Sequence, residues 1–180
     1  QYLEWIIWRA FLAINNLSNK PYESRKFQLD SNLRPTSHAP SRAPDLIMEF
    51  DKFTLVVEVT WTASSRQVAA EGEPVIRHVA QVAYDSAKPT YCLFIAPTID
   101  MNTLESYRVN DTYYLENNYE QVANIIPISL DEFIKFFIDI PKAKKQSVEK
   151  IYSIMRECTS IKKNLKSTEW KEFISNKFVA

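Results

Sequence analysis

Glycine is almost absent from this sequence. It occurs once, as Gly72, among 180 residues, whereas average usage near 7% would give about a dozen. Cysteine occurs twice, which is too few for a disulfide framework. No apolar run approaches the roughly 20 residues of a membrane helix, and no signal-peptide pattern opens the chain. These absences argue against a disulfide scaffold and a membrane-spanning protein, and we expect a bacterial cytoplasmic location.

The length and the overall composition are those of one globular domain. Hydrophobic residues make up 46% and charged residues 24% of the chain, which is ordinary soluble usage. A second domain would leave each half too small for a sizeable core. Gln1 already lies within a helical pattern, so we expect the natural chain to begin upstream of it.

Charge is balanced overall but unevenly distributed. The 22 basic and 22 acidic residues sum to zero. Residues 1–43 carry six basic and three acidic groups, residues 44–140 six and fifteen, and residues 141–180 ten and four. An acidic centre suits a cation site and basic flanks suit a phosphate backbone, although solvated helix faces explain the same pattern. A neutral chain lacks the electrostatic footprint of an independent DNA binder.

The hydrophobic periodicity predicts an α/β fold with a central mixed β-sheet flanked by α-helices. We expect an amphipathic helix over 2–16, an irregular arm over 17–43 and strands over 45–50, 53–60, 90–96 and 124–128. Further helices are predicted over 64–70, 74–86, 101–109 and 130–139, with two more over 142–178. A buried strand that follows a helical connection predicts parallel pairing. We divide the domain into a core, 1–140, and a C-terminal helical extension, 141–180.

The register of the predicted hairpin brings two acids together. If Asp51 and Lys52 form the loop, Phe50 pairs with Phe53 and Asp45 faces Glu58. A four-residue loop keeps this register, whereas a three- or five-residue loop shifts it. The alternative is that Asp45 ends a loop and Glu58 lies on an exposed strand face.

Two carboxylates that face each other across a hairpin repel each other, so their placement requires an explanation. Their Cβ atoms lie about 4.5–5.5 Å apart on one face, where like charges repel. Hard divalent cations such as Mg²⁺ take oxygen ligands from one or two carboxylates. The spacing therefore predicts a metal site.

At these residues the chain resembles a known family. Pro44-Asp45 followed by Glu58-Val59-Thr60 is similar to the P-D…(D/E)-x-K signature of restriction-endonuclease-like nucleases. Wider similarity to the cleavage domains of AlwI-like type IIS restriction and nicking endonucleases spans positions 4–137. It is carried by EWIIWRAFLA, APDLIMEF, LVVEVTWTASSRQ, AAEGEPVIRHVAQ, CLFIAPTIDMNT and IIPISLDEFIKF.

The resemblance implies a restriction-endonuclease-like core and a set of metal ligands. It implies that Mg²⁺, for which Mn²⁺ can substitute, is bound by Asp45, Glu58, the backbone carbonyl of Val59 and Glu71. It also implies a further catalytic acid, Glu4, from the first helix. The alternative for Glu4 is an exposed glutamate in a first helical turn.

One position departs from the family pattern. Thr60 stands where the family lysine would orient the attacking water, and Lys52 lies too far along the hairpin to replace it. Glu71 is the better candidate, because a third carboxylate can bind a second ion or orient water. Its neighbour Gly72 is interpreted as a left-handed residue between two helices, with Pro74 starting the second.

Three side chains on the connecting helices are candidates for DNA contacts. Arg66, Arg77 and His78 could reach phosphates, although cations on helix surfaces are commonly only solvated.

The sequence thus favours a Mg²⁺-dependent endonuclease that hydrolyses one strand of double-stranded DNA. AlwI-like enzymes carry a large recognition region ahead of the cleavage domain, and a chain of 180 residues has no room for one. We therefore interpret the chain as the small subunit of a heterodimeric type IIS enzyme. A larger sequence-recognising subunit would be its partner. The alternative is a catalytically silent nuclease-like module that scaffolds a partner or DNA, which the absent lysine and neutral charge favour.

Overall fold

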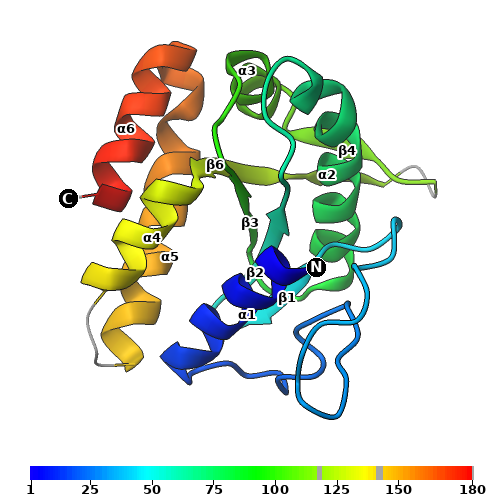
Figure 1. The fold of residues 1–180 in the computed structure, drawn as a ribbon. Coiled ribbons are helices and arrows are strands. Elements are labelled where there is room, and N and C mark those ends of the chain that lie inside the picture. The colour runs from blue at the N-terminus through cyan, green and yellow to red at the C-terminus, as the bar shows by residue number, and fades with distance from the viewer. Residues whose placement is uncertain (117–118, 141–143, 180) are drawn as a thin grey trace.

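A computed structural model shows a mixed four-stranded β-sheet enclosed by helices (Figure 1). The structure describes residues 1–116, 119–140 and 144–179. The strands are β1 (Leu46–Glu49), β2 (Thr54–Val59), β3 (Thr90–Ala96) and β6 (Asn124–Ser129), with β4 (Thr112–Tyr114) and β5 (Glu120–Val122) in a separate antiparallel pair. The helices are α1 (Tyr2–Ile14), α2 (Arg66–Asp85), α3 (Met101–Val109), α4 (Leu130–Asp139), α5 (Lys144–Ile161) and α6 (Ser167–Val179), and a short 3₁₀ helix, η1 (Lys162–Asn164), follows α5. In the described part of the chain, no helix is long and apolar enough to cross a bilayer.

The sheet has the mixed topology that the sequence predicts. Its order is β1-β2-β3-β6, with β1 antiparallel to β2 and the other two pairs parallel. The hairpin register is also confirmed, because Leu46 pairs with Val57 and Glu49 with Thr54. Continuing that register by one residue sets position 45 opposite position 58.

Strand β2 is buried on both faces, which makes it the centre of the core. Phe53 stacks at 4.7 Å on Tyr152 of α5, on one side of the sheet. The Thr54 hydroxyl bonds Ser86 just beyond α2, on the other side. Phe53, directly before β2, and Thr54, its first residue, therefore contact different helical layers, and Figure 1 shows α2 and α5 on opposite sides of the sheet.

The arm before β1 covers the open edge of the sheet. Arg25 forms an isolated antiparallel bridge with Leu46, and the Ile47 N–H donates to the Ser24 carbonyl at 2.9 Å. The indole of Trp8 in α1 anchors the arm by donating to the Ser24 hydroxyl at 2.9 Å. The edge strand thereby finds partners for its backbone groups.

Helix α2 corrects the prediction of two helices broken near Gly72. It runs without interruption through Gly72, which is buried and has no positive φ, and through Pro74. An interior proline costs a helix roughly 3 kcal/mol. Burial of Val75, Ile76 and Val79 against the core overrides both local helix breakers.

The aromatic-rich stretch without a predicted element forms the β4–β5 hairpin. Its strands have three residues each and alternate between exposed and half-buried positions. The ring of Tyr119 contacts Tyr84 of α2 at 5.5 Å, and the Tyr113 hydroxyl donates to Glu73 at 3.1 Å. This hairpin therefore packs on α2 rather than extending the main sheet.

The C-terminal helices pack on α4 and the sheet. The predicted stripe of Ile151, Ile154, Met155 and Cys158 on α5 is buried. The predicted capping box of Ser129 and Glu132 at the start of α4 is present with both of its bonds. The predicted helical positions 142 and 143 lie outside the described residues.

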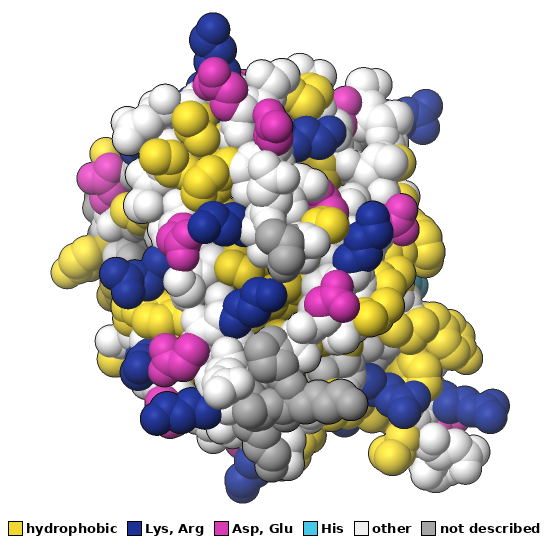
Figure 2. Space-filling model, turned by 90° about the vertical axis from the view of Figure 1, so that its left-hand side faces the viewer, with side chains coloured by type: hydrophobic (Ala, Val, Ile, Leu, Met, Phe, Trp, Pro, Cys, Tyr) yellow, Lys and Arg dark blue, Asp and Glu magenta, His cyan; other side chains and the backbone are white. Residues whose placement is uncertain are grey.

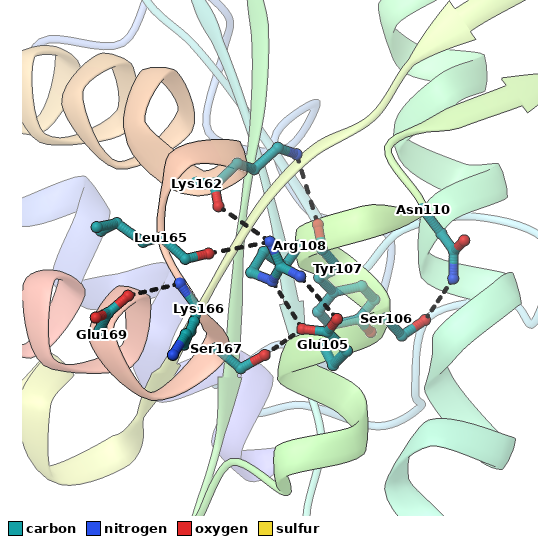
Figure 3. Close-up of polar contacts among 10 residues, drawn as sticks. All are labelled: Glu105, Ser106, Tyr107, Arg108, Asn110, Lys162, Leu165, Lys166, Ser167 and Glu169. Atoms are coloured by element: carbon teal, nitrogen blue, oxygen red, sulfur yellow. Dashed lines mark hydrogen bonds and ion pairs between the residues drawn. The ribbon is translucent and has the colours of Figure 1, made fainter.

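Arg108 of α3 ties these helices to the core (Figure 3). Its guanidinium donates to the carbonyls of Lys162 and Leu165 and pairs with Glu105, whose carboxylate also accepts from the Ser167 hydroxyl. The Arg108 and Ser167 hydrogen bonds lower the pKa of Glu105 from 4.5 to about 2. This cluster joins α3 to the turn before α6.

Gly72→Ala is expected to stabilise the protein. Alanine is better than glycine in a helix by about 0.5–1 kcal/mol, and a Cβ here would meet Val68 at 3.6 Å and Ser106 at 3.8 Å, both ordinary contacts. Urea unfolding should show a correspondingly higher free energy of unfolding. A decrease would instead support the left-handed conformation first predicted for Gly72.

Glu105→Gln is expected to weaken the link between α3 and α6 in a pH-dependent way. Because the folded pKa of Glu105 is lowered, its contribution is present above pH 4.5 and is lost as pH falls toward 2. The side chain is 44% exposed, and exposed ion pairs contribute roughly 0.2–1 kcal/mol. Urea unfolding should show a difference of this size at neutral pH that shrinks below pH 4.5. A pH-independent difference would contradict the ionic origin.

Candidate active site

The hairpin holds two acids side by side at the carboxyl end of β2. Glu58 is in β2, and Asp45 lies one residue before β1. The Val59 N–H donates to Asp45 Oδ2 at 2.8 Å, which ties the first acid to the strand that carries the second. The structure therefore brings Asp45 and Glu58 together as the hairpin register predicts.

Both of these acids resist ionisation. Burial, followed by the charges of Glu58 and Glu4, raises the pKa of Asp45 from 3.8 to about 8, against the lowering effect of the Val59 N–H. Burial also raises the pKa of Glu58, although the hydrogen bond and charge of His78 act in the opposite direction. Mutual repulsion and desolvation thus act together on one small site.

His78 lies inside the site rather than on the helix surface. It is 8% exposed, and its Nδ1 lies 2.8 Å from Glu58 Oε1. Its Nε2 is buried without a hydrogen-bond partner among the described residues. The sequence predicts a contact between His78 and DNA, and the structure places His78 as the direct neighbour of Glu58.

Glu71 approaches the same end of β2 from helix α2. Its Oε1 accepts a hydrogen bond from the Thr60 hydroxyl at 2.7 Å. Its backbone carbonyl accepts from the Tyr107 hydroxyl at 3.1 Å. Thr60, at the position of the family lysine, therefore holds the third acid by a side-chain hydrogen bond.

Gln67 is a positioning residue that sequence reasoning missed. It is fully buried, and its amide donates to the carbonyls of Thr62 and Thr98 at 2.7 and 2.9 Å. This contact fixes the loop after β2. Gln67, Glu71 and His78 follow an i, i+4, i+11 spacing on one helix face, a signal that the predicted break at Gly72 concealed.

Glu4 lies in the first turn of α1, and its side chain is buried rather than exposed. It is 6% exposed, and its Oε1 lies 2.8 Å from Nδ1 of His38. Its Oε2 is buried without a partner among the described residues, and its charge contributes to the raised pKa of Asp45. The structure thus places Glu4, the fourth predicted acid, close enough to Asp45 for its charge to act on that carboxyl.

The donors present fit a hard cation. Glu4 carries a buried carboxylate oxygen without a partner, and Asp45 and Glu58 have raised pKa values. A nearby positive charge would relieve the repulsion and favour their ionised forms. Within the described residues, no three His, Cys, Asp or Glu side chains already form a ligand cluster.

The two candidate arginines differ in setting. Arg66 is exposed at the start of α2 and forms no ion pair within the ranges that the structure describes. Arg77 pairs with Glu73 at 3.2 Å and lines a groove of about 740 Å³ beside His78. Of these two arginines, only Arg77 lines the groove that also contains His78.

A protein-family comparison covers the part of the chain that holds this site. The model of the AlwI restriction endonuclease family matches residues 1–136 of the 180. The chain belongs to the AlwI restriction endonuclease family. The match includes all four acids, Gln67 and His78.

The fold of this AlwI-family chain is similar to that of a solved structure, the small subunit (R.BspD6I2) of the heterodimeric restriction endonuclease R.BspD6I. The similarity has a TM-score of 0.79 at 22% sequence identity, and it covers 97% of this chain and 88% of that one. The comparison confirms the predicted restriction-endonuclease-like fold. A search of curated protein sequences gives no match.

Asp45→Asn is expected to abolish stabilisation of this AlwI-family protein by divalent cations. Wild type should gain stability on addition of Mg²⁺ or Mn²⁺, by about 2.7 kcal/mol at a concentration one hundred times Kd. Without metal, the variant should be more stable than wild type near neutral pH. Burial raises the pKa of Asp45 from 3.8 to about 8, so wild type must take up a proton at this carboxyl to fold between these pH values, and asparagine need not. Thermal unfolding in EDTA and in each metal measures both effects.

The matched control is Glu172→Gln, which neutralises an exposed acid on α6. It should keep the full metal-induced shift. An equal shift in Asp45→Asn and wild type would contradict a metal site at this residue.

Proposed function

We propose that this chain is the Mg²⁺-dependent cleavage subunit of a type IIS restriction endonuclease and hydrolyses one strand of double-stranded DNA. The observation that carries the proposal is the convergence of Asp45, Glu58 and Glu71 from a rigid hairpin and one helix. Family membership supports a site-specific nuclease. The site residues in the proposal are four acids and one carbonyl, namely Glu4, Asp45, Glu58, the Val59 carbonyl and Glu71.

The metal ligands in this proposal are Asp45, Glu58, the Val59 carbonyl and Glu71. When bound, Mg²⁺ or Mn²⁺ supplies Lewis-acid activation of water and of the phosphate. The protein contributes orientation, because His78 holds the Glu58 carboxylate and Thr60 holds that of Glu71. Glu71, so fixed, takes the water-orienting role that a lysine has in the family pattern.

A larger partner completes the proposed enzyme. The similar structure is the small subunit of a heterodimeric restriction endonuclease, and we transfer that assembly to this chain. The partner would recognise the DNA sequence and cut the other strand. Residues 1–140 would form the catalytic core, and residues 141–180 would form an extension that the Arg108 cluster connects to it. The whole chain would be one domain, located in the bacterial cytoplasm as part of a restriction-modification system.

Glu58→Ala is expected to abolish cleavage of the second strand. The chain is purified together with the product of the adjacent gene and incubated with supercoiled plasmid in Mg²⁺. Wild type should produce linear DNA, whereas the variant complex should stop at nicked circles, with second-strand cleavage reduced roughly a hundredfold or more. EDTA should stop both cuts.

Two controls separate chemistry from folding. Glu58→Gln keeps the shape of the side chain and should be equally inactive, and Glu172→Gln should cleave as wild type does. Unchanged linearisation by both Glu58 variants would overturn the proposal and favour a silent scaffolding module.

A further inference from the structure

We propose that the groove beside His78 binds the sugar-phosphate backbone of the DNA strand next to the cleaved bond. This inference rests on the proposed function and extends it to a defined path for the substrate. The groove measures about 740 Å³ and is lined by the arm before β1, by α2 and by the β4–β5 hairpin. Its wall includes Pro44, the residue before Asp45, and His78, whose Nδ1 lies 2.8 Å from Glu58 Oε1.

Two cations on the arm are held at this groove without partners of their own. Lys26 and Arg42 both line it, and neither side chain forms an ion pair or hydrogen bond within the described residues. The backbone N–H of Lys26 donates to the Asp45 carbonyl at 3.2 Å, and Arg42 lies three residues before Asp45. The backbone therefore holds both residues close to Asp45. Their positive charges would help a phosphate to approach this acid.

The opposite wall adds a third cation in a fixed position. Arg77 lines the groove from α2, and Glu73 holds its guanidinium at 3.2 Å while also accepting from the Tyr113 hydroxyl. The acid Asp85, which also lines the groove, lies two helical turns beyond His78 at the end of α2. A second acid, Glu116 of the β4–β5 hairpin, also lines the groove, so its lining carries three basic and two acidic residues.

The end of the groove is formed by the β4–β5 hairpin. Tyr114 is 66% exposed there, and a tyrosine can pack its ring on a sugar while its hydroxyl reaches a phosphate. The hairpin is held to α2 by the Tyr84–Tyr119 ring contact. An exposed aromatic ring beside Lys26 and Arg42 suits a nucleic-acid backbone.

The C-terminal helices offer a less suitable surface despite their excess of basic residues. Figure 2 shows the face that bears them, where Lys and Arg are interspersed with Asp and Glu. Several of these cations are already paired, as with Lys177 and Glu157, and with Lys162 and Asp111. Paired charges release fewer counterions on binding DNA.

Lys26→Ala/Arg42→Ala is expected to weaken DNA binding and its dependence on salt. The binding of a short fluorescein-labelled DNA duplex is measured by anisotropy, in EDTA, over a series of low NaCl concentrations. Each lost phosphate contact lowers the slope of log K against log salt by about 0.9, so this double variant should lose about 1.8. The matched control, Lys135→Ala/Lys171→Ala, removes two exposed cations from α4 and α6 and should keep the wild-type slope.

The outcomes separate this inference from the proposed function. Equal slopes for wild type and the groove variant, an equal loss in the control variant, or no binding by wild type would each overturn the groove assignment. Thermal unfolding of both variants excludes a loss of fold. If the groove variant loses binding while Glu58→Ala leaves plasmid cleavage unchanged, the path for DNA holds and the catalytic proposal fails.

Discussion

The burial of like-charged carboxylates at the end of β2 is the constraint on which the rest of the site depends. Isolated buried carboxylates are strongly disfavoured unless hydrogen bonds or a cation compensate them. The Val59 N–H and His78 each supply one such contact, to Asp45 and Glu58 respectively. These contacts hold the acids in place but leave their pKa values raised, so the compensation in the protein alone is incomplete. In the proposed metal site, a bound cation would complete this compensation.

Helix α2 carries most of the remaining organisation. Gln67 fixes the loop after β2, Glu71 adds the third acid and His78 contacts Glu58. The helix is itself braced by α3, because the Tyr107 hydroxyl donates to the Glu71 carbonyl. The next residue, Arg108, binds carbonyls of the turn before α6. The C-terminal helices are therefore mechanically connected to the acidic centre through two adjacent residues of α3.

Features that local sequence determines could be predicted, and features that tertiary packing determines could not. The register that opposes Asp45 and Glu58 follows from strand alternation and a two-residue loop, and the Ser129 capping box is a local motif. The continuity of α2 depends on packing that outweighs Gly72 and Pro74. Since the helix was divided there, the shared face of Gln67, Glu71 and His78 could not be recognised.

The number of cations in the groove bears on how this chain would reach DNA. The two cations unpaired among the described residues, Lys26 and Arg42, offer about two phosphate contacts, for a salt slope near −1.8, and Arg77 is already paired with Glu73, whereas proteins that bind DNA firmly make roughly six to ten. With zero net charge, long-range attraction to DNA adds little. We therefore expect the groove to set the direction of the strand through the site, while most of the binding free energy comes from a second protein. In the proposed heterodimer, the cleavage subunit would therefore stay inactive until the recognition subunit has found its sequence.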